Sequence, residues 1–227
     1  IACEKYGIDV VGGDTSSSKQ GLIISVTSIG YADEKDICYR NGANEGDLLC
    51  VSGDLGGAYL GLLFLEREKK IFLESPAVQP DLENETYVIG RLLKPKARKD
   101  IFEFFEEKDI LQTSMMDISD GLSSELLHIC EKSEVGCVIY EEKLPISEDT
   151  RNAAYKFEID PTACALSGGE DYELVFTIKQ DDYEKLTLNE QISVIGYVTD
   201  AEEGAKFKSK GGNTFDITAQ GWNAFKQ

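Results

Sequence analysis

Two aspartates, a serine and a glycine stand close together at 117–121, and residues of these types at this spacing could bind a metal and phosphates. The segment Met115-Met116-Asp117-Ile118-Ser119-Asp120-Gly121-Leu122 ends an apolar run and opens a helical pattern. The pattern predicts a strand, a tight turn and a helix. Asp117 would lie at the strand end and Asp120 at or next to the helix N-cap, where the helix dipole favours negative charge. Carboxylates, a hydroxyl and free N–H groups can together hold hydrated Mg²⁺ and the phosphates that it bridges.

A purely structural explanation covers the same residues. Asp120 could be an ordinary N-cap, because aspartate is among the residues that most often cap a helix. Asp117 could be a solvated strand end. The octapeptide alone leaves both explanations open.

Two further segments place acids next to glycines. Ser167-Gly168-Gly169-Glu170-Asp171-Tyr172-Glu173-Leu174 opens an alternating strand predicted at 172–178, and Gly12-Gly13-Asp14-Thr15 follows a short apolar strand predicted at 8–11. The two glycines allow close backbone approach, and Asp14 is displayed at the strand end. An ordinary turn explains that tetrapeptide equally well. Arg40, in Arg40-Asn41-Gly42-Ala43, is either a surface residue or a bidentate phosphate ligand.

The elements that must position these residues are readable from apolar periodicity. A composition shift at 44–47 marks a boundary, so we expect one domain at 1–45 and a second at 46–227. The predicted strands are 8–11, 21–32, 48–52, the run that ends at Asp117, 135–140, 172–178 and 192–198, with a hairpin at 204–213. One predicted helix runs from Gly57 to about Glu66, and another begins at Leu122. Further helices are predicted at 83–93, 99–107, 147–155, 161–166 and 181–188.

Composition excludes some classes of partner. The chain has 227 residues, 41% of them apolar, and a formal net charge of −19. This charge argues against nucleic acids and anionic membranes as partners but allows phosphate ligands if a divalent metal supplies the positive charge. The six cysteines form no C-x-x-C pair, which indicates reduced thiols in a cytoplasmic protein. No apolar run approaches the ~20 residues of a membrane span.

Five motifs in a fixed order carry a family resemblance: GGDT at 12–15, RNGA at 40–43, GD at 46–47, DISDGL at 117–122 and SGGEDYEL at 167–174. Together they resemble the thiamine-monophosphate kinases, members of a superfamily that includes aminoimidazole ribonucleotide synthetase and selenophosphate synthetase. The resemblance runs from the first residues through Gly221-Trp222, and the pairing of DISDGL with SGGEDYEL is its most specific part.

The resemblance implies an α/β (α+β) fold: a partial N-terminal ATP-binding sheet domain and a C-terminal mixed-sheet domain flanked by helices. It implies transfer of the γ-phosphoryl group of ATP to thiamine monophosphate, with several Mg²⁺ ions, no covalent phosphoenzyme and a homodimer at full length. The implied ATP ligands are Gly13, Asp14, Arg40 and Ser119, the implied metal ligands are Asp14, Asp117 and Asp120, and the implied substrate contacts are Glu170, Asp171 and Trp222. Which of the two adjacent acids touches the substrate stays open.

The beginning of the sequence adds an expectation. Residues 1–7 resemble the last turns of a helix closed by a glycine, and family members carry further metal-binding aspartates in an N-terminal stretch that these residues lack. We therefore expect an N-terminally truncated chain that is inactive alone, with residues 1–45 poorly ordered or paired with another copy. Two alternatives remain: another ATP-dependent synthetase of the same superfamily, and a non-catalytic binding or dimerisation module.

Overall fold

The computed structural model describes residues 1–219, so Trp222 lies outside the described residues. The chain divides into two compact units, Ile1–Ile37 and the remainder from Cys38.

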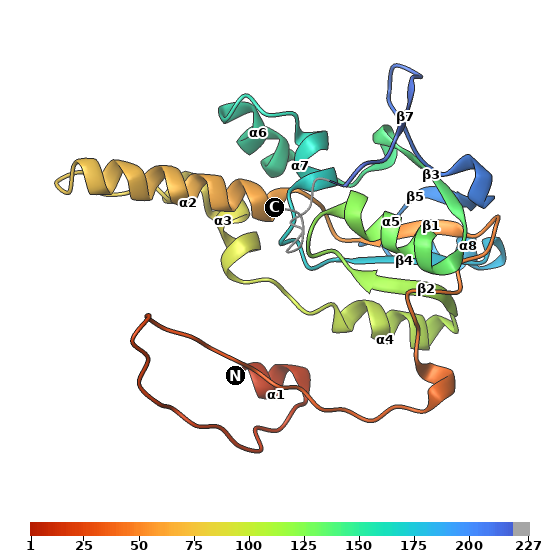
Figure 1. Ribbon diagram of the computed structural model, residues 1–227, viewed down its shortest axis with the longest axis horizontal. Coiled ribbons are helices and arrows are strands. Elements are labelled where there is room, and N and C mark those ends of the chain that lie inside the picture. The colour runs from red at the N-terminus through yellow and green to blue at the C-terminus, as the bar shows by residue number, and fades with distance from the viewer. Residues whose placement is uncertain (220–227) are drawn as a thin grey trace. The chain divides into compact units, whose positions relative to one another are not determined.

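The first unit contains one short helix and little other regular structure (Figure 1). Helix α1 (Ala2–Tyr6) ends as predicted at Gly7, which adopts the left-handed conformation with φ 67°. The predicted strands at 8–11 and 21–32 are wrong, because no strand is formed within residues 1–37. A strand needs a hydrogen-bonded neighbour and a covered face to be stable. Here the apolar side chains of both segments are exposed, including Val10 at 78% and Ile23 at 73%.

The second unit is built on one mixed sheet. Within residues 38–219 the strand order of this seven-stranded sheet is β2-β4-β1-β5-β3-β6-β7. Neighbouring strands are antiparallel except for β3 and β6, which are parallel. The mixed sheet flanked by helices confirms the expected fold class. The strands are β1 (Leu48–Ser52), β2 (Gln112–Asp117), β3 (Gly136–Tyr140), β4 (Leu174–Ile178), β5 (Ile192–Thr199), β6 (Ala205–Lys208) and β7 (Thr214–Asp216).

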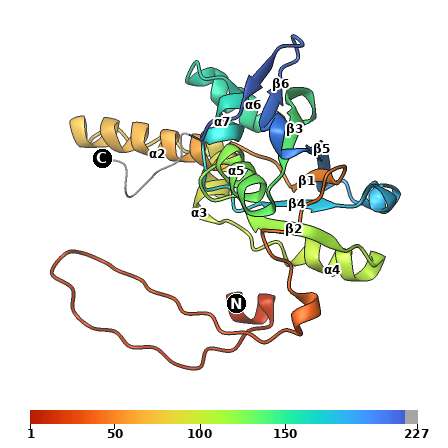
Figure 2. The same cartoon turned by 45° about the vertical axis from the view of Figure 1, so that its right-hand side comes forward.

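Alternation along the central strands divides the core between the two faces of the sheet. In β1, Leu49 and Val51 belong to the cluster that contains helix α5 (Leu122–Ser133), whereas Cys50 belongs to the cluster under α4 (Lys99–Lys108) and α8 (Tyr183–Leu186). Successive side chains point to opposite faces of a strand, so one short apolar strand supplies both clusters. Figures 1 and 2 show α4 and α5 on opposite sides of the sheet.

Four more helices form a separate layer with its own apolar cluster. They are α2 (Gly57–Glu74), α3 (Thr86–Leu93), α6 (Glu148–Lys156) and α7 (Pro161–Ser167). Leu60 and Phe64 are fully buried there, each contributing about 1.5–3 kcal/mol. A Cβ on Gly61 would lie 2.2 Å from the carbonyl oxygen of Val88, so only glycine lets α2 and α3 pack this closely. Helix α2 extends eight residues beyond the predicted end at Glu66, because its charged stretch continues the helix.

Candidate active site

The DISDGL segment forms the predicted strand, turn and helix. Asp117 is the last residue of β2, Ile118 is buried, and α5 begins at Leu122. Both aspartates are exposed. The N-cap of α5 is Gly121, whose φ of 116° few other residues adopt, and within the described chain no side chain caps this helix. The interpretation of Asp120 as an ordinary N-cap is therefore wrong, because Asp120 lies one residue before the cap.

A glutamate that the sequence analysis missed holds the turn. Glu125, in the first turn of α5, is only 1% exposed. Its Oε1 accepts hydrogen bonds from the Ser119 amide at 3.1 Å, the Ser119 hydroxyl at 3.3 Å and the Asp120 amide at 2.9 Å. Burial raises the pKa of this carboxyl, against the effect of the backbone donors. The expectation that the N–H groups of this turn are free for phosphates is thus wrong for Ser119 and Asp120.

The SGGEDYEL segment lies directly against the DISDGL turn. The Glu170 amide donates to the Ser119 carbonyl at 2.8 Å, the Tyr172 amide donates to the Ile118 carbonyl at 2.9 Å, and the Ile118 amide donates to the Glu173 carbonyl at 2.7 Å. Glu170 and Tyr172 have positive φ values of 64° and 51°. Such conformations are uncommon for residues other than glycine and are often maintained at functional sites. Thus two motifs that are distant in the sequence form one unit.

This pairing places four polar side chains near one another. The pKa of the Tyr172 phenol is raised, first by partial burial, then by the charge of Glu170 and a hydrogen bond to it, and then by the charges of Asp117 and Asp120. Tyr172 is 38% exposed, so this group of side chains is accessible from solvent. The ends of β2 and of the segment before β4 therefore present an acidic surface with one aromatic ring.

Asp171 occupies a different environment from its neighbour Glu170. It is 1% exposed, and its two oxygens accept hydrogen bonds from the amides of Gly56 at 2.7 Å and Ala58 at 3.2 Å, at the start of α2. Burial raises its pKa to about 6, although both hydrogen bonds and Arg91 act in the opposite direction. Asp171 is one of the two acids expected to contact substrate, and in this structure its carboxylate is buried and bonds to the start of α2. Glu170, which is exposed, is the acid available to a ligand.

Glu173 forms a buried ionic network that the sequence analysis also missed. Its carboxylate accepts from the Ser52 hydroxyl at 2.6 Å and forms ion pairs with Arg91 at 2.9 Å and Arg98 at 2.5 Å. Arg91 also donates to the Asp54 and Asp171 carbonyls, at 3.0 and 3.3 Å. The network fixes the start of β4 to α3 and to the turn after β1, and so fixes the position of Glu170.

The donor set at the acidic surface fits Mg²⁺ only in combination with a phosphate ligand. Among residues 1–219, no group of three or more His, Cys, Asp or Glu side chains is arranged to hold a metal by itself. Mg²⁺ commonly binds through one or two carboxylates, waters and substrate phosphates. The exposed carboxylates of Asp117 and Asp120 fit that pattern.

The remaining predicted site residues are Gly13, Asp14, Arg40 and Trp222. Gly13 and Asp14 are exposed residues of the first unit. Arg40 is exposed in the second unit, next to Tyr39, whose carbonyl accepts from Met115 of β2 at 3.0 Å. It therefore lies beside the strand that ends at Asp117. Trp222 lies outside the described residues.

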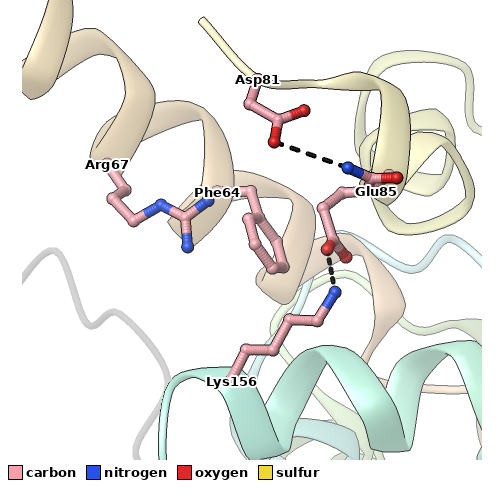
Figure 3. Close-up of a pocket in the computed structure, with 6 residues that line it drawn as sticks. Phe64, Arg67, Asp81, Glu85 and Lys156 are labelled. Carbon is pink, nitrogen blue, oxygen red and sulfur yellow. Dashed lines mark hydrogen bonds and ion pairs between the residues drawn. The ribbon is translucent and has the colours of Figure 1, made fainter.

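A separate groove of about 470 Å³ lies between α2, the segment before α3 and α6 (Figure 3). Arg67 stacks on Phe64, with its guanidinium carbon 4.6 Å from the ring centroid, and Lys156 pairs with Glu85. Arg67 forms its ion pair with Glu68, at 2.9 Å, which is not among the lining residues. The lining contains none of the residues predicted from the sequence: Phe64, Arg67, Asp81, Asn84, Glu85 and Lys156.

The fold and the paired acidic segments define the class of protein. The family model described as AIR synthase related protein, C-terminal domain, matches residues 44–208, and the chain belongs to this family. Among curated relatives, the thiamine-monophosphate kinase of Buchnera aphidicola subsp. Schizaphis graminum is 34% identical over 226 residues, covering 93% of this chain and 65% of the relative. The thiamine-monophosphate kinase of Aquifex aeolicus is 34% identical over 218 residues, covering 94% and 65%.

A solved structure agrees with these relatives. The structure of AaThiL complexed with AMPPCP and TMP matches with a TM-score of 0.65 and 32% identity, over 83% of this chain and 54% of that chain. This chain thus spans just under two thirds of the curated relatives' length and about half of the solved chain. Within residues 1–219, no helix is both long and apolar enough to cross a membrane.

Proposed function

We propose that the chain contributes to an ATP-dependent kinase that phosphorylates thiamine monophosphate to thiamine diphosphate. The observation that carries the proposal is the backbone pairing of the DISDGL turn with the SGGEDYEL segment, which gathers Asp117, Asp120 and Glu170 at one edge. The similarity to thiamine-monophosphate kinases and to the AMPPCP and TMP complex supports the choice of substrates. We also propose a cytoplasmic location, because all six cysteines are free thiols.

In this proposal the side chains position ATP and thiamine monophosphate, which are both polyanions. By themselves they neutralise little of the negative charge on these substrates. Asp117 and Asp120 would hold Mg²⁺, which supplies the positive charge that offsets the phosphates during transfer. Ser119 and Arg40 would contact ATP, and the family resemblance also assigns Gly13 and Asp14 to ATP binding. No nucleophilic side chain is required, so the transfer is direct and in line.

Glu170 and Trp222 would contact the acceptor. The thiazolium ring of thiamine monophosphate is cationic, so a carboxylate and an indole face suit it. Glu170 is exposed beside Tyr172, whose ring forms part of the same surface. Binding of thiamine monophosphate should therefore change the emission of Trp222, the only tryptophan.

We further propose that the described residues do not suffice for turnover. The two carboxylates at the DISDGL turn are too few to hold all the Mg²⁺ ions that would neutralise ATP, and further metal ligands are needed. At full length we expect a homodimer. Two alternatives stay open: another ATP-dependent synthetase of the same superfamily, and a module that only binds or dimerises.

Calorimetric titration with ATP tests the proposal directly. The expected result is binding in the presence of Mg²⁺ that is lost in excess chelator. Equal affinity in both conditions would overturn the metal-bridged site, and no heat in either would favour the binding or dimerisation module. An assay of ADP release with thiamine monophosphate, run on this chain and on the complete reading frame, tests turnover. Comparable rates in the two would overturn the proposed inactivity of the chain alone.

A further inference from the structure

Glu125 joins the acidic turn to helix α5 from within the core. Its Oε1 accepts three hydrogen bonds from Ser119 and Asp120, as described above. Its other oxygen, Oε2, is buried and has no hydrogen-bond partner among the described residues. A buried carboxylate oxygen without a partner carries a desolvation cost. An apolar residue at this position could fill the same space without that cost. The presence of a glutamate therefore points to a role for the three hydrogen bonds that its Oε1 accepts.

The turn is bonded on both sides of its backbone. Glu125 holds the amide side of residues 119 and 120, and the SGGEDYEL segment holds the carbonyl side through the amides of Glu170 and Tyr172. With amides and carbonyls both engaged inward, the carboxylates of Asp117 and Asp120 are the groups left to face solvent. Their relative position is then set by the backbone.

We propose that Glu125 is a positioning residue for the metal-binding turn, holding Asp117 and Asp120 in the arrangement that a divalent cation needs. The inference rests on the proposed function for its metal, but its structural part concerns only this chain. The Ser119 hydroxyl donates its proton to Glu125, so its oxygen lone pairs are the part left for a ligand.

Glu125→Ala and Glu125→Gln test the proposal in the full chain. Glutamine keeps an acceptor oxygen in the same shape, whereas alanine removes it. In E125A, amide hydrogen exchange at Ser119 and Asp120 should accelerate by about tenfold to about a hundredfold, which is the factor expected for losing a hydrogen bond to a charged group. In E125Q it should stay within about threefold of the wild type, because a neutral acceptor retains much of the bond.

Metal affinity is the second measurement, with Mn²⁺ as the probe and electron paramagnetic resonance as the readout. E125A should bind Mn²⁺ at least ~10-fold more weakly, since displaced ligands lose preorganised geometry, and E125Q should recover most of the affinity. Asp47→Ala is the matched control. Asp47 is also a buried carboxylate, and it accepts from the Asn44 amide at 2.9 Å and the Thr113 hydroxyl at 2.7 Å, at the opposite end of β2.

The outcomes separate the two levels of the proposal. If D47A lowers stability as much as E125A but leaves Mn²⁺ affinity and exchange at Ser119 and Asp120 unchanged, the positioning role is supported. If D47A weakens Mn²⁺ binding equally, or if E125A leaves exchange at the turn unchanged, the inference is overturned. If wild-type protein binds no Mn²⁺, the metal-binding part of the proposed function fails and the positioning role fails with it. The exchange data then still show whether Glu125 orders the turn.

Discussion

The amide of Glu170 donates a hydrogen bond of 2.8 Å to the carbonyl of Ser119, and this bond joins two acidic segments that are distant in the sequence. Gly169, just before it, approaches the same carbonyl so closely that a Cβ would lie 2.7 Å from the oxygen. The acidic surface therefore depends on backbone contact between two turns.

Substitution of Gly169 by alanine should separate these turns. Gly169 has φ 74°, and its added Cβ would collide with backbone atoms of Ser119 and Asp120. Gly212 has φ 83° with nothing within 4 Å of an added Cβ, so G212A puts an alanine at a positive φ without the collision. We expect G212A to lower the free energy of unfolding by about 1 kcal/mol and G169A by at least twice as much, measured by urea unfolding. Equal losses would show that the close contact is dispensable.

Replacing Asp117 or Asp120 by asparagine should impair chemistry and spare stability. Both side chains are exposed, so the free energy of unfolding should change by no more than about 0.5 kcal/mol. ADP release in the complete reading frame should fall at least ~100-fold, because charge stabilisation at the phosphates is lost. Asp181→Asn, another exposed aspartate, is the control and should have no effect. Variants that lose stability but keep their specific activity would indicate a structural role.

Glu170 and Asp171 should respond in opposite ways. E170Q should leave stability unchanged and weaken binding of thiamine monophosphate. D171A should lower the free energy of unfolding by about 2–4 kcal/mol, because two buried amides and the Arg91 guanidinium lose their acceptor. Urea unfolding and fluorescence titration measure the two effects. Wild-type stability in D171A would place that carboxylate outside the core.

The raised pKa of Asp171 predicts a pH dependence. The folded state holds this proton with a pKa of about 6, against an ordinary value of 3.8. Because the folded state then binds the proton more tightly, the group stabilises the fold as pH falls from about 7 to about 5, and this gain is lost as pH rises through 6. The stability difference between wild type and D171N should be about 1 kcal/mol larger at pH 5 than at pH 7. Urea unfolding at both pH values checks this, and an equal difference would contradict the raised pKa.

The thermal stability of the second unit should depend on residues 38–45. The amides of Gly42 and Ala43 donate to the Ser133 hydroxyl at 3.1 and 3.2 Å, and Ala43 is buried. A chain that starts at Cys38 should melt like the full chain. One that starts at Gly46 loses these contacts and the Tyr39 bond to β2, and its Tm should fall by about 3–8 °C. Identical melting of the two shortened chains, followed by circular dichroism, would show that residues 38–45 add nothing.

Much of the second unit was predictable because its elements follow local patterns. The apolar run ending at Asp117, the helical spacing from Leu122, and the strand at 48–52 all correspond to observed elements. The roles of Glu125, Asp171 and Glu173 were not predictable. Each depends on a partner brought close by folding, such as Gly56 for Asp171. In an acidic sequence, an aspartate that caps a buried helix looks the same as one that faces a ligand.

In the first unit, by contrast, local patterns predicted strands that do not form. Its apolar alternation at 21–32 is as suggestive as that of a true strand, yet no strand forms within residues 1–37. Periodicity reports which side chains could be covered, and it is silent on whether a neighbouring strand is present to pair with. The same pattern at 192–198 becomes β5 because β1 and β3 flank it.

The contact between Ser119 and Glu170 also links ligand binding to the order in which the chain acquires its structure. Strand β2 pairs with β4, and the turn after β2 bonds to the segment before β4, so the acidic surface is absent from any partly folded form in which β4 is detached from β2. A cation or nucleotide that binds there selects the completed sheet and raises its stability in proportion to ln(1 + [L]/Kd). Ligand concentration would then shift the equilibrium between the completed sheet and forms in which β4 is detached.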